Sequence, residues 1–255
     1  TFWVQSAINA AFDLGLTVEE ADAIAGKPMG VPGTGVFGLM DLVGLDLVPH
    51  VRQSLTATLP ADDPYQAIAR EQPRIEAMLA AGLTGRKGKG GFYRLNREAG
   101  GRKEAIDLAT GEYRPSVKAP PPEGLAGKGD LAALIAAPGK VGAYAWAILG
   151  PTLSYAAQLA PEIAHDVAAI DDAMKLGYNW RFGPFELIDK LGAANLAARL
   201  RAEGRPVPPL LQMAGERPFH RVEAGCRQVL GFDGTYRNLV RPQGVLLLED
   251  LRFAG

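Results

Sequence analysis

The sequence predicts an all-α protein made of two related helical domains, residues 1–95 and 131–215, packed on each other with pseudo-twofold symmetry. Two observations support this fold class. Apolar residues recur at helical spacing along most of the chain, and no run has the alternation or the clustered β-branched residues typical of a sheet. The second observation is a repeated phrase, whose copies lie too far apart for a solenoid and therefore indicate a duplicated domain.

The repeated phrase is F-x3-D-x2-G, which occurs within residues 26–49 and again within residues 170–196. A helical pattern precedes each copy. An acidic residue upstream is also shared, because Asp22 lies opposite Asp171 with a shift of one residue. The matched positions inside the phrase are Phe37 with Phe185, Asp41 with Asp189, and Gly44 with Gly192.

In the first domain, helices are separated by turns that the sequence marks clearly. Thr17 lies three residues before Glu20, which predicts a capping box at the start of a helix. Residues 26–35 contain two prolines and four glycines and are expected to form a loop. Pro64 suits the first turn of a later helix. The helices expected in this domain cover residues 1–14, 18–26, 36–48 and 62–83.

Beyond residue 95 the composition changes. Residues 96–130 are polar and rich in proline and glycine, which predicts an exposed connector with a small hairpin around Thr110-Gly111. Helical spacing resumes at residue 131 and defines the second domain. The tail, residues 216–255, is expected to contain a turn and an extended segment that lead toward a further domain.

One segment, residues 141–160, has no charged residue and is long enough to span a bilayer. It also contains several polar side chains and Pro151, and no similar segment exists elsewhere in the sequence. We therefore favour a central buried helix, bent near the proline, over a membrane span.

Composition favours a globular protein in a reducing compartment. The 255 residues carry a formal net charge of −1, which gives no electrostatic reason to expect a nucleic acid or an anionic membrane as partner. Cys226 is the single cysteine, so an intrachain disulfide is impossible and a cytoplasmic location is expected. The first residues look like the middle of a helix, without a signal peptide or an initiator methionine, so we expect a longer parent chain.

Two glycine-rich motifs suggest ligand binding. Residues 33–38 match G-x-G-x-x-G, but the prolines just before them exclude the central strand that a dinucleotide-binding loop requires, so we interpret the match as coincidental. Residues 85–91 place Arg86, Lys87 and Lys89 among glycines. Such a loop can bind a phosphate or can be a solvated turn, and the residues alone leave both alternatives open.

No catalytic or metal-binding set is indicated by local motifs. The three histidines lie far apart in the sequence, and none has a neighbouring ligand or nucleophile. Asp41 and Asp189 occur in both copies of the phrase among apolar neighbours, which favours a structural turn partner over a general base. We therefore predict no catalytic residue and no metal site. The histidines are His50, His165 and His220.

The chain resembles the paired C-terminal domains of 3-hydroxyacyl-CoA dehydrogenases, the NAD-dependent enzymes that oxidise 3-hydroxyacyl-CoA in fatty-acid β-oxidation. The resemblance rests on MGVPGTGVFGLMDLVGLD, GLTGRKGKGGFYRL and IDDAMKLGYNWRFGPFELIDKLG and covers nearly residues 1–225. It implies a fold like the C-terminal region of 6-phosphogluconate dehydrogenase. The tail, FDGTYRNLVRPQGVLLLEDLR, looks like the linker of bifunctional members in which an enoyl-CoA hydratase domain follows.

The resemblance also implies which functions this segment lacks. Family members carry their NAD-binding Rossmann domain and their His–Glu catalytic pair upstream of this region, so the segment alone is expected to be inactive. It would form a wall of the acyl-CoA and NAD cleft, and its two copies would pair within the chain. In the family, a lysine of the basic loop approaches NAD. Lys87 matches that position, and Lys89 can share the role because the loop departs slightly from the family pattern.

Two other functions remain open on the sequence. The first is a non-catalytic acyl-CoA-binding or assembly module, and the second is a hydroxyacid dehydrogenase relative, which would lack the second copy of the phrase. The length of the parent polypeptide separates the module from the enzyme region.

Overall fold

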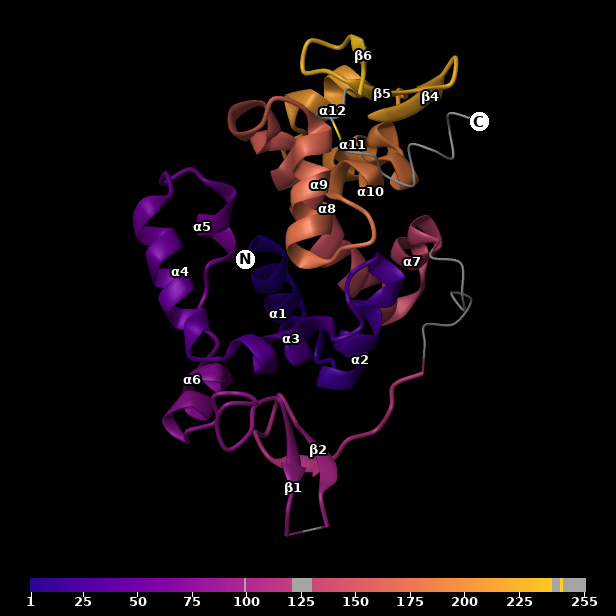
Figure 1. Cartoon of the computed structure of the whole chain (residues 1–255). Helices are drawn as coiled ribbons and strands as arrows, with labels where there is room; N and C mark the ends of the chain where they lie inside the picture. The colour runs from indigo at the N-terminus through magenta and orange to yellow at the C-terminus, as the bar shows by residue number, and fades with distance from the viewer. Residues whose placement is uncertain (99, 121–129, 240–243, 245–255) are drawn as a thin grey trace. The chain divides into compact units, whose positions relative to one another are not determined.

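The computed structural model describes residues 1–98, 100–120, 130–239 and 244, and it is mainly helical, as the sequence predicts. The chain divides into two compact units, Thr1–Leu149 and Gly150–Gly255. Each unit combines helices with a small three-stranded antiparallel sheet (Figure 1).

The helices of the first unit begin and end at local sequence signals. They are α1 (Phe2–Leu14), α2 (Val18–Ile24), the 3-10 helix η1 (Lys27–Met29), α3 (Gly35–Val43), α4 (Leu47–Thr58), α5 (Pro64–Ile68), α6 (Pro73–Ala80) and α7 (Leu131–Ala136). The capping box predicted at α2 is confirmed, because the Thr17 hydroxyl accepts from the backbone N–H of Glu20, whose carboxylate accepts from the backbone N–H of Thr17. Gly15 ends α1 in the left-handed conformation, with φ 57°.

The single helix predicted over residues 62–83 is two helices, α5 and α6. Asp63 caps α5, with its Oδ1 accepting from the backbone N–H of Tyr65 at 2.7 Å. Pro73 occupies the first position of α6. A proline cannot donate the hydrogen bond that a continuous helix would need at this point, so the helical pattern is interrupted there.

The connector predicted over residues 96–130 contains the expected hairpin, but this hairpin pairs with residues 93–96 and forms a three-stranded sheet with buried residues, so the first part is not an exposed connector. The strands are β1 (Tyr93–Asn96), β2 (Arg102–Ile106) and β3 (Tyr113–Pro115), in the order β1-β2-β3. Ala105 and Ile106 of β2 are buried. Strands of three to five residues are too short to show a clear alternating pattern in the sequence.

The hairpin predicted around Thr110-Gly111 is confirmed, since these residues lie in the turn between β2 and β3, whose register pairs Ile106 with Tyr113. The boundary expected at residue 95 thus falls inside the sheet. The proline-rich segment at residues 121–129 lies outside the described residues.

The uncharged segment at residues 141–160 belongs to one long helix, α8 (Gly139–Ile163), which continues through Pro151. Its buried side chains support the interpretation of this segment as a core helix. Among the described residues, no helix combines the length and apolar character that a bilayer crossing requires. The buried residues include Tyr144, Ala145, Ile148, Leu149, Leu153, Ala157 and Ala160.

The second unit has helices followed by its own sheet. The helices are α9 (Val167–Tyr178), α10 (Pro184–Leu191), α11 (Ala193–Ala202) and α12 (Pro209–Ala214), and the strands are β4 (His220–Glu223), β5 (Cys226–Leu230) and β6 (Tyr236–Asn238). The tail predicted over residues 216–255 is therefore an ordered sheet in its first half. Residues 240–243 and 245–255, where the sequence suggests the approach to another domain, lie outside the described part.

A pair of phenylalanine rings joins helix to sheet in the core of each unit. Phe37 and Phe92 meet edge to face with ring centroids 4.5 Å apart, and Phe185 and Phe219 do the same at 4.9 Å. All four side chains are fully buried. As the repeated phrase predicts, Phe37 and Phe185 occupy alike environments, and edge-to-face contact adds to the stabilisation from burial.

Candidate functional site

An acidic side chain from α2 caps the N-terminus of α3. Asp22 accepts hydrogen bonds from the backbone N–H groups of Phe37 at 2.7 Å and Gly38 at 3.0 Å, and from the Tyr93 hydroxyl at 2.9 Å. Gly35 approaches so closely, with φ 65°, that a Cβ there would lie 2.4 Å from the Asp22 carboxyl carbon. The contact therefore requires glycine and ties α2, α3 and β1 together.

A second acidic side chain, Asp41 on α3, holds the glycine-rich loop of residues 85–91. Its two carboxylate oxygens accept from the backbone N–H groups of Phe92 and Tyr93, each at 2.7 Å. A Cβ at Gly91 would lie 1.9 Å from Oδ1, so only glycine permits this approach. The structural role predicted for Asp41 is confirmed.

The second unit repeats this arrangement with one change. Asp171 accepts from the N–H groups of Phe185 at 2.8 Å and Glu186 at 3.1 Å at the start of α10. Asp189 accepts from the N–H groups of Phe219 at 2.5 Å and His220 at 2.8 Å, which confirms its structural role too.

The change is that His220 stands where the first unit has Tyr93. Its Nδ1 lies 2.9 Å from Asp189 Oδ2, and its Nε2 lies 3.3 Å from Asp171 Oδ2. Both ring nitrogens thus face carboxylates, an arrangement that suits the protonated imidazole because only this form donates from both nitrogens.

Burial and these hydrogen bonds shift the pKa values of the acidic groups in opposite directions. Burial raises the pKa of Asp22 to about 7 and that of Asp41 to about 6, although the N–H donors act in the opposite direction. Burial likewise raises the pKa of Asp171 to about 7. Burial lowers the pKa of His220, but the hydrogen bond to Asp189 and the charge of Asp171 outweigh it, so the net shift is upward. Because donors from the protein occupy these carboxylates, we assign them no catalytic role.

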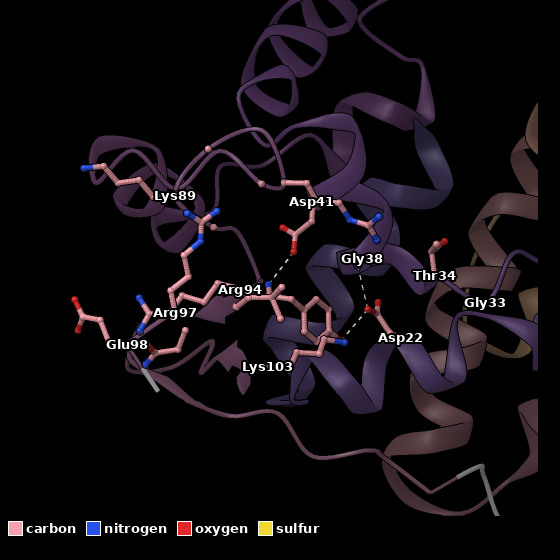
Figure 2. Close-up of a pocket in the computed structure, with 17 residues that line it drawn as sticks. Asp22, Gly33, Thr34, Gly38, Asp41, Lys89, Arg94, Arg97, Glu98 and Lys103 are labelled. Atoms are coloured by element: carbon pink, nitrogen blue, oxygen red, sulfur yellow. Dashed lines mark hydrogen bonds between the residues drawn. The ribbon is translucent and has the colours of Figure 1, made fainter. Parts of the chain in front are cut away.

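A basic pocket of about 1150 Å³ opens in the first unit (Figure 2). It is lined by the start of α3, the loop of residues 85–91 and strands β1 and β2. Arg94 in this lining is paired, because its guanidinium lies 2.7 Å from Glu104 and 3.6 Å from the centroid of the Tyr113 ring. The charged side chains of the lining are Asp22, Asp41, Arg86, Lys89, Arg94, Arg97, Glu98 and Lys103.

The two predicted cofactor-binding lysines occupy different surroundings. Lys87 lies outside the pocket lining, with its Nζ 2.7 Å from Asp46 Oδ1, and both side chains are about half exposed. This ion pair lowers the pKa of Asp46. Lys89 lines the pocket, and Figure 2 shows its side chain directed away from Asp22 and Asp41. The loop thus presents one paired lysine and one that forms no ion pair with any described residue.

The other sequence motifs have structural explanations. The segment before Gly33 is η1 rather than a strand, and the N–H groups of Phe37 and Gly38 are taken by Asp22, so residues 33–38 are not a dinucleotide-binding loop. Cys226 is exposed on β5. Within the described residues, no cluster of three or more His, Cys, Asp or Glu side chains is placed to hold a metal ion.

Comparison with known proteins identifies the family. The chain matches the family model of the 3-hydroxyacyl-CoA dehydrogenase C-terminal domain over residues 2–95 and 142–216. The chain therefore belongs to this family of C-terminal domains.

Curated relatives agree with this assignment. The chain is 33% identical over 196 residues to a Rickettsia felis protein described as a fatty acid oxidation complex trifunctional enzyme, covering 76% of this chain and 26% of that protein. It is 34% identical over 246 residues to a Bacillus subtilis protein described as a 3-hydroxyacyl-CoA dehydrogenase, covering 93% of this chain and 30% of that protein. The chain thus spans between a quarter and a third of the length of these relatives.

The sequence predicts the loop of residues 85–91 as a binding element, but it does not predict the part of the pocket that strands β1 and β2 line. Arg97 and Lys103 lie on the β1–β2 hairpin, which the sequence predicts as a connector, and Tyr93 meets Asp22 across 71 positions of sequence. A local signal exists, since Gly91-Phe92-Tyr93 in the first unit corresponds to Pro218-Phe219-His220 in the second. Aligning these two phrases would predict that an equivalent strand begins at Tyr93 and at His220.

Proposed function

We propose that this chain is the C-terminal helical region of an NAD-dependent 3-hydroxyacyl-CoA dehydrogenase of fatty-acid β-oxidation. The observation that carries the proposal is the loop of residues 85–91, which Asp41 holds in place beside a basic pocket, in a chain of this family. The activity belongs to the parent polypeptide, in which a Rossmann domain supplies the catalytic pair. The chain alone is inactive on this account.

The residues of the loop fit the pyrophosphate of NAD, a cofactor that when bound accepts the hydride from the substrate carbinol carbon. Lys89 is free of ion pairs with the described residues. Among the described residues, the ion-pair partner of Lys87 is the half-exposed Asp46. Because exposed ion pairs contribute little stability, Lys87 can exchange this partner for a phosphate. The surrounding helices form a wall of the acyl-CoA cleft and exclude water from it.

We also infer that the two units are copies of one domain and that the first copy alone keeps the cofactor loop. The matched contacts of Asp22 with Asp171 and of Asp41 with Asp189 support the duplication. In the second unit, the segment between α12 and β4 carries Arg217, which donates to the backbone carbonyls of Met213 and Gly234. These bonds occupy N–H donors of the exposed guanidinium and leave it less available to a ligand.

The remaining partners follow from this assignment. We propose an acyl-CoA substrate, an N-terminal Rossmann domain, and a C-terminal enoyl-CoA hydratase domain in the same parent chain. Neither a nucleic acid nor a membrane is proposed as a partner. A cytoplasmic location suits a chain with a single exposed cysteine.

Steady-state kinetics of the parent enzyme with Lys87→Ala and Lys89→Ala test the proposal. Loss of a charge-assisted phosphate contact should raise the KM for NAD by roughly tenfold to a hundredfold. Lys118→Ala is the matched control, because Lys118 is exposed, lies outside the pocket lining and should leave the KM unchanged. An unchanged KM for NAD in both loop variants would show that the loop is a solvated turn that does not bind NAD. A parent without dehydrogenase activity would favour the assembly module.

A further inference from the structure

We propose that the basic pocket of the first unit binds the phosphorylated adenosine end of coenzyme A, meaning its 3′-phosphate together with its diphosphate. This inference rests on the proposed function, since it names the group of the acyl-CoA substrate that the pocket holds. It adds Arg86, Arg97 and Lys103 to the binding residues and extends the site beyond the loop lysines.

The pocket gathers cations that form no ion pair with a described carboxylate. Among the described residues, Arg86, Lys89, Arg97 and Lys103 form no ion pair, and the Lys103 Nζ lies 4.2 Å from the centroid of the Tyr93 ring. Several other cations of this unit are paired with carboxylates. These pairs include Arg52 with Glu71, Arg70 with Asp13, Lys87 with Asp46 and Arg114 with Glu19.

Among the described residues, the acidic side chains of the lining form no ion pair with these cations, although the charges of Arg86 and Lys103 act on Asp41 from a longer range. Asp22 and Asp41 direct their oxygens at backbone N–H groups and at the Tyr93 hydroxyl. The pKa of Asp22, raised to about 7, further reduces its negative charge near neutral pH. Glu98 is exposed and forms no ion pair with any described cation of the lining. The pocket therefore has a net positive character that an anionic ligand would complement.

The volume and the charge of the pocket both suit a nucleotide that carries several phosphates. Small-molecule sites usually measure roughly 300–1,000 Å³, so a pocket of about 1150 Å³ admits a nucleotide. Figure 2 shows Lys89 and Arg97 at one side of the pocket, whereas Lys103 lies over the Tyr93 ring, so the cations are spread rather than focused on one point. A phosphate monoester carries about −1.5 to −2 charges at pH 7. Coenzyme A has this 3′-phosphate in addition to a diphosphate, whereas NAD has the diphosphate alone. Arg86, Arg97 and Lys103, in addition to the loop lysines assigned to NAD, supply the positive charge that a further phosphate requires.

Calorimetry on the 255-residue chain at low ionic strength tests the inference with coenzyme A, dephospho-coenzyme A and NAD as probes. We expect coenzyme A to bind at least about tenfold more tightly than the other two. The double variant Arg97→Gln with Lys103→Gln should weaken coenzyme A binding by about tenfold or more, since two charge-assisted contacts are lost. Both side chains are exposed, so the variant should keep the wild-type circular dichroism spectrum.

Arg201→Gln on α11 is the matched control, because Arg201 is an exposed cation of the second unit, and it should leave binding unchanged. Absence of coenzyme A binding, or binding that the double variant does not weaken, would overturn the inference. Equal affinity for all three probes would overturn the assignment to coenzyme A in favour of a diphosphate site.

The parent enzyme distinguishes this inference from the proposed function. Arg97→Gln with Lys103→Gln should raise the KM for 3-hydroxyacyl-CoA and leave the KM for NAD unchanged. If the double variant is an active dehydrogenase with an unchanged KM for 3-hydroxyacyl-CoA, the pocket does not bind this substrate. The proposed function would stand in that case.

Discussion

Four aspartates organise this chain, and each acts by accepting backbone N–H groups from another element. Asp22 and Asp171 cap helices, while Asp41 and Asp189 fix the first residues of a sheet. A carboxylate can serve two N–H donors at once, and a buried donor without a partner is costly. This chemistry explains why an acid recurs among apolar neighbours in both copies of the phrase.

Asp41→Ala should lower the free energy of unfolding of the first unit by about 2–5 kcal/mol, because it leaves the buried N–H groups of Phe92 and Tyr93 without acceptors. Urea denaturation followed by circular dichroism measures the change. Asp62→Ala at an exposed site should stay within about 0.5 kcal/mol of the wild type. A comparably small effect for Asp41→Ala would show that the carboxylate is not needed for the loop.

The free energy of unfolding of the second unit should fall as the pH rises through neutrality. The folded-state pKa of His220 lies above its ordinary value of 6.5, so the stabilisation from the protonated ring is complete below 6.5 and is lost as the pH rises through the folded-state value. The pKa of Asp171, raised to about 7, acts with the same sign from its ordinary value of 3.8 upward. Asp189 and Glu186 face the same ring and favour its charge.

Chemical denaturation at a series of pH values from about 5.5 to 8.5 measures this dependence. An NMR titration, with the His220 signal assigned by its absence in His220→Tyr, should give a pKa above 6.5. Stability that rises over this range, or a lower pKa, would contradict the buried carboxylate–imidazole–carboxylate arrangement.

The elements differ in how far the sequence could predict them. Helices with strong signals, such as α2 with its Thr17–Glu20 box, are predicted to within a few residues. The short strands are missed, apart from the turn at Thr110-Gly111, because glycine-rich composition resembles a connector and three to five residues show no period. The role of His220, which occupies the position of Tyr93 in the first unit, could not be predicted from nearby residues. Its carboxylate partners lie 31 and 49 positions away in the sequence.

Gly91→Ala should disrupt the loop of residues 85–91, because the added Cβ would lie 1.9 Å from Asp41 Oδ1. We expect a loss of roughly 2 kcal/mol or more in unfolding free energy, together with a higher KM for NAD in the parent enzyme. Gly177→Ala is the matched control. Gly177 lies inside α9, and an added methyl group there would meet open space, so the change should be neutral or stabilise by about 0.4–1 kcal/mol. Equal effects of the two changes would contradict the packing of the loop on Asp41.

The whole chain covers between a quarter and a third of the length of its curated relatives. Its two units repeat the same contacts, but the basic pocket that we describe lies in the first. The pseudo-twofold packing expected from the repeated phrase stays a prediction. The sequence indicates the family through its phrases, whereas the pocket requires the fold, because its cations come from a loop and a hairpin.

The chain alone should bind NAD weakly or not at all, because the loop offers only a few cations and the proposed Rossmann domain would supply most of the contacts. Titration calorimetry with NAD measures this, with coenzyme A as the positive comparison. Tight stoichiometric binding of NAD to the 255-residue chain would contradict the proposal that the Rossmann domain makes most of the contacts with NAD.

The central claim is that this chain serves a 3-hydroxyacyl-CoA dehydrogenase without containing its catalytic residues. The most direct measurement is the reduction of NAD by 3-hydroxyacyl-CoA, followed by absorbance, for the parent polypeptide and for the 255-residue chain side by side. We predict turnover by the parent and none by the chain. Turnover by the chain alone, or a parent that does not oxidise 3-hydroxyacyl-CoA, would contradict the claim.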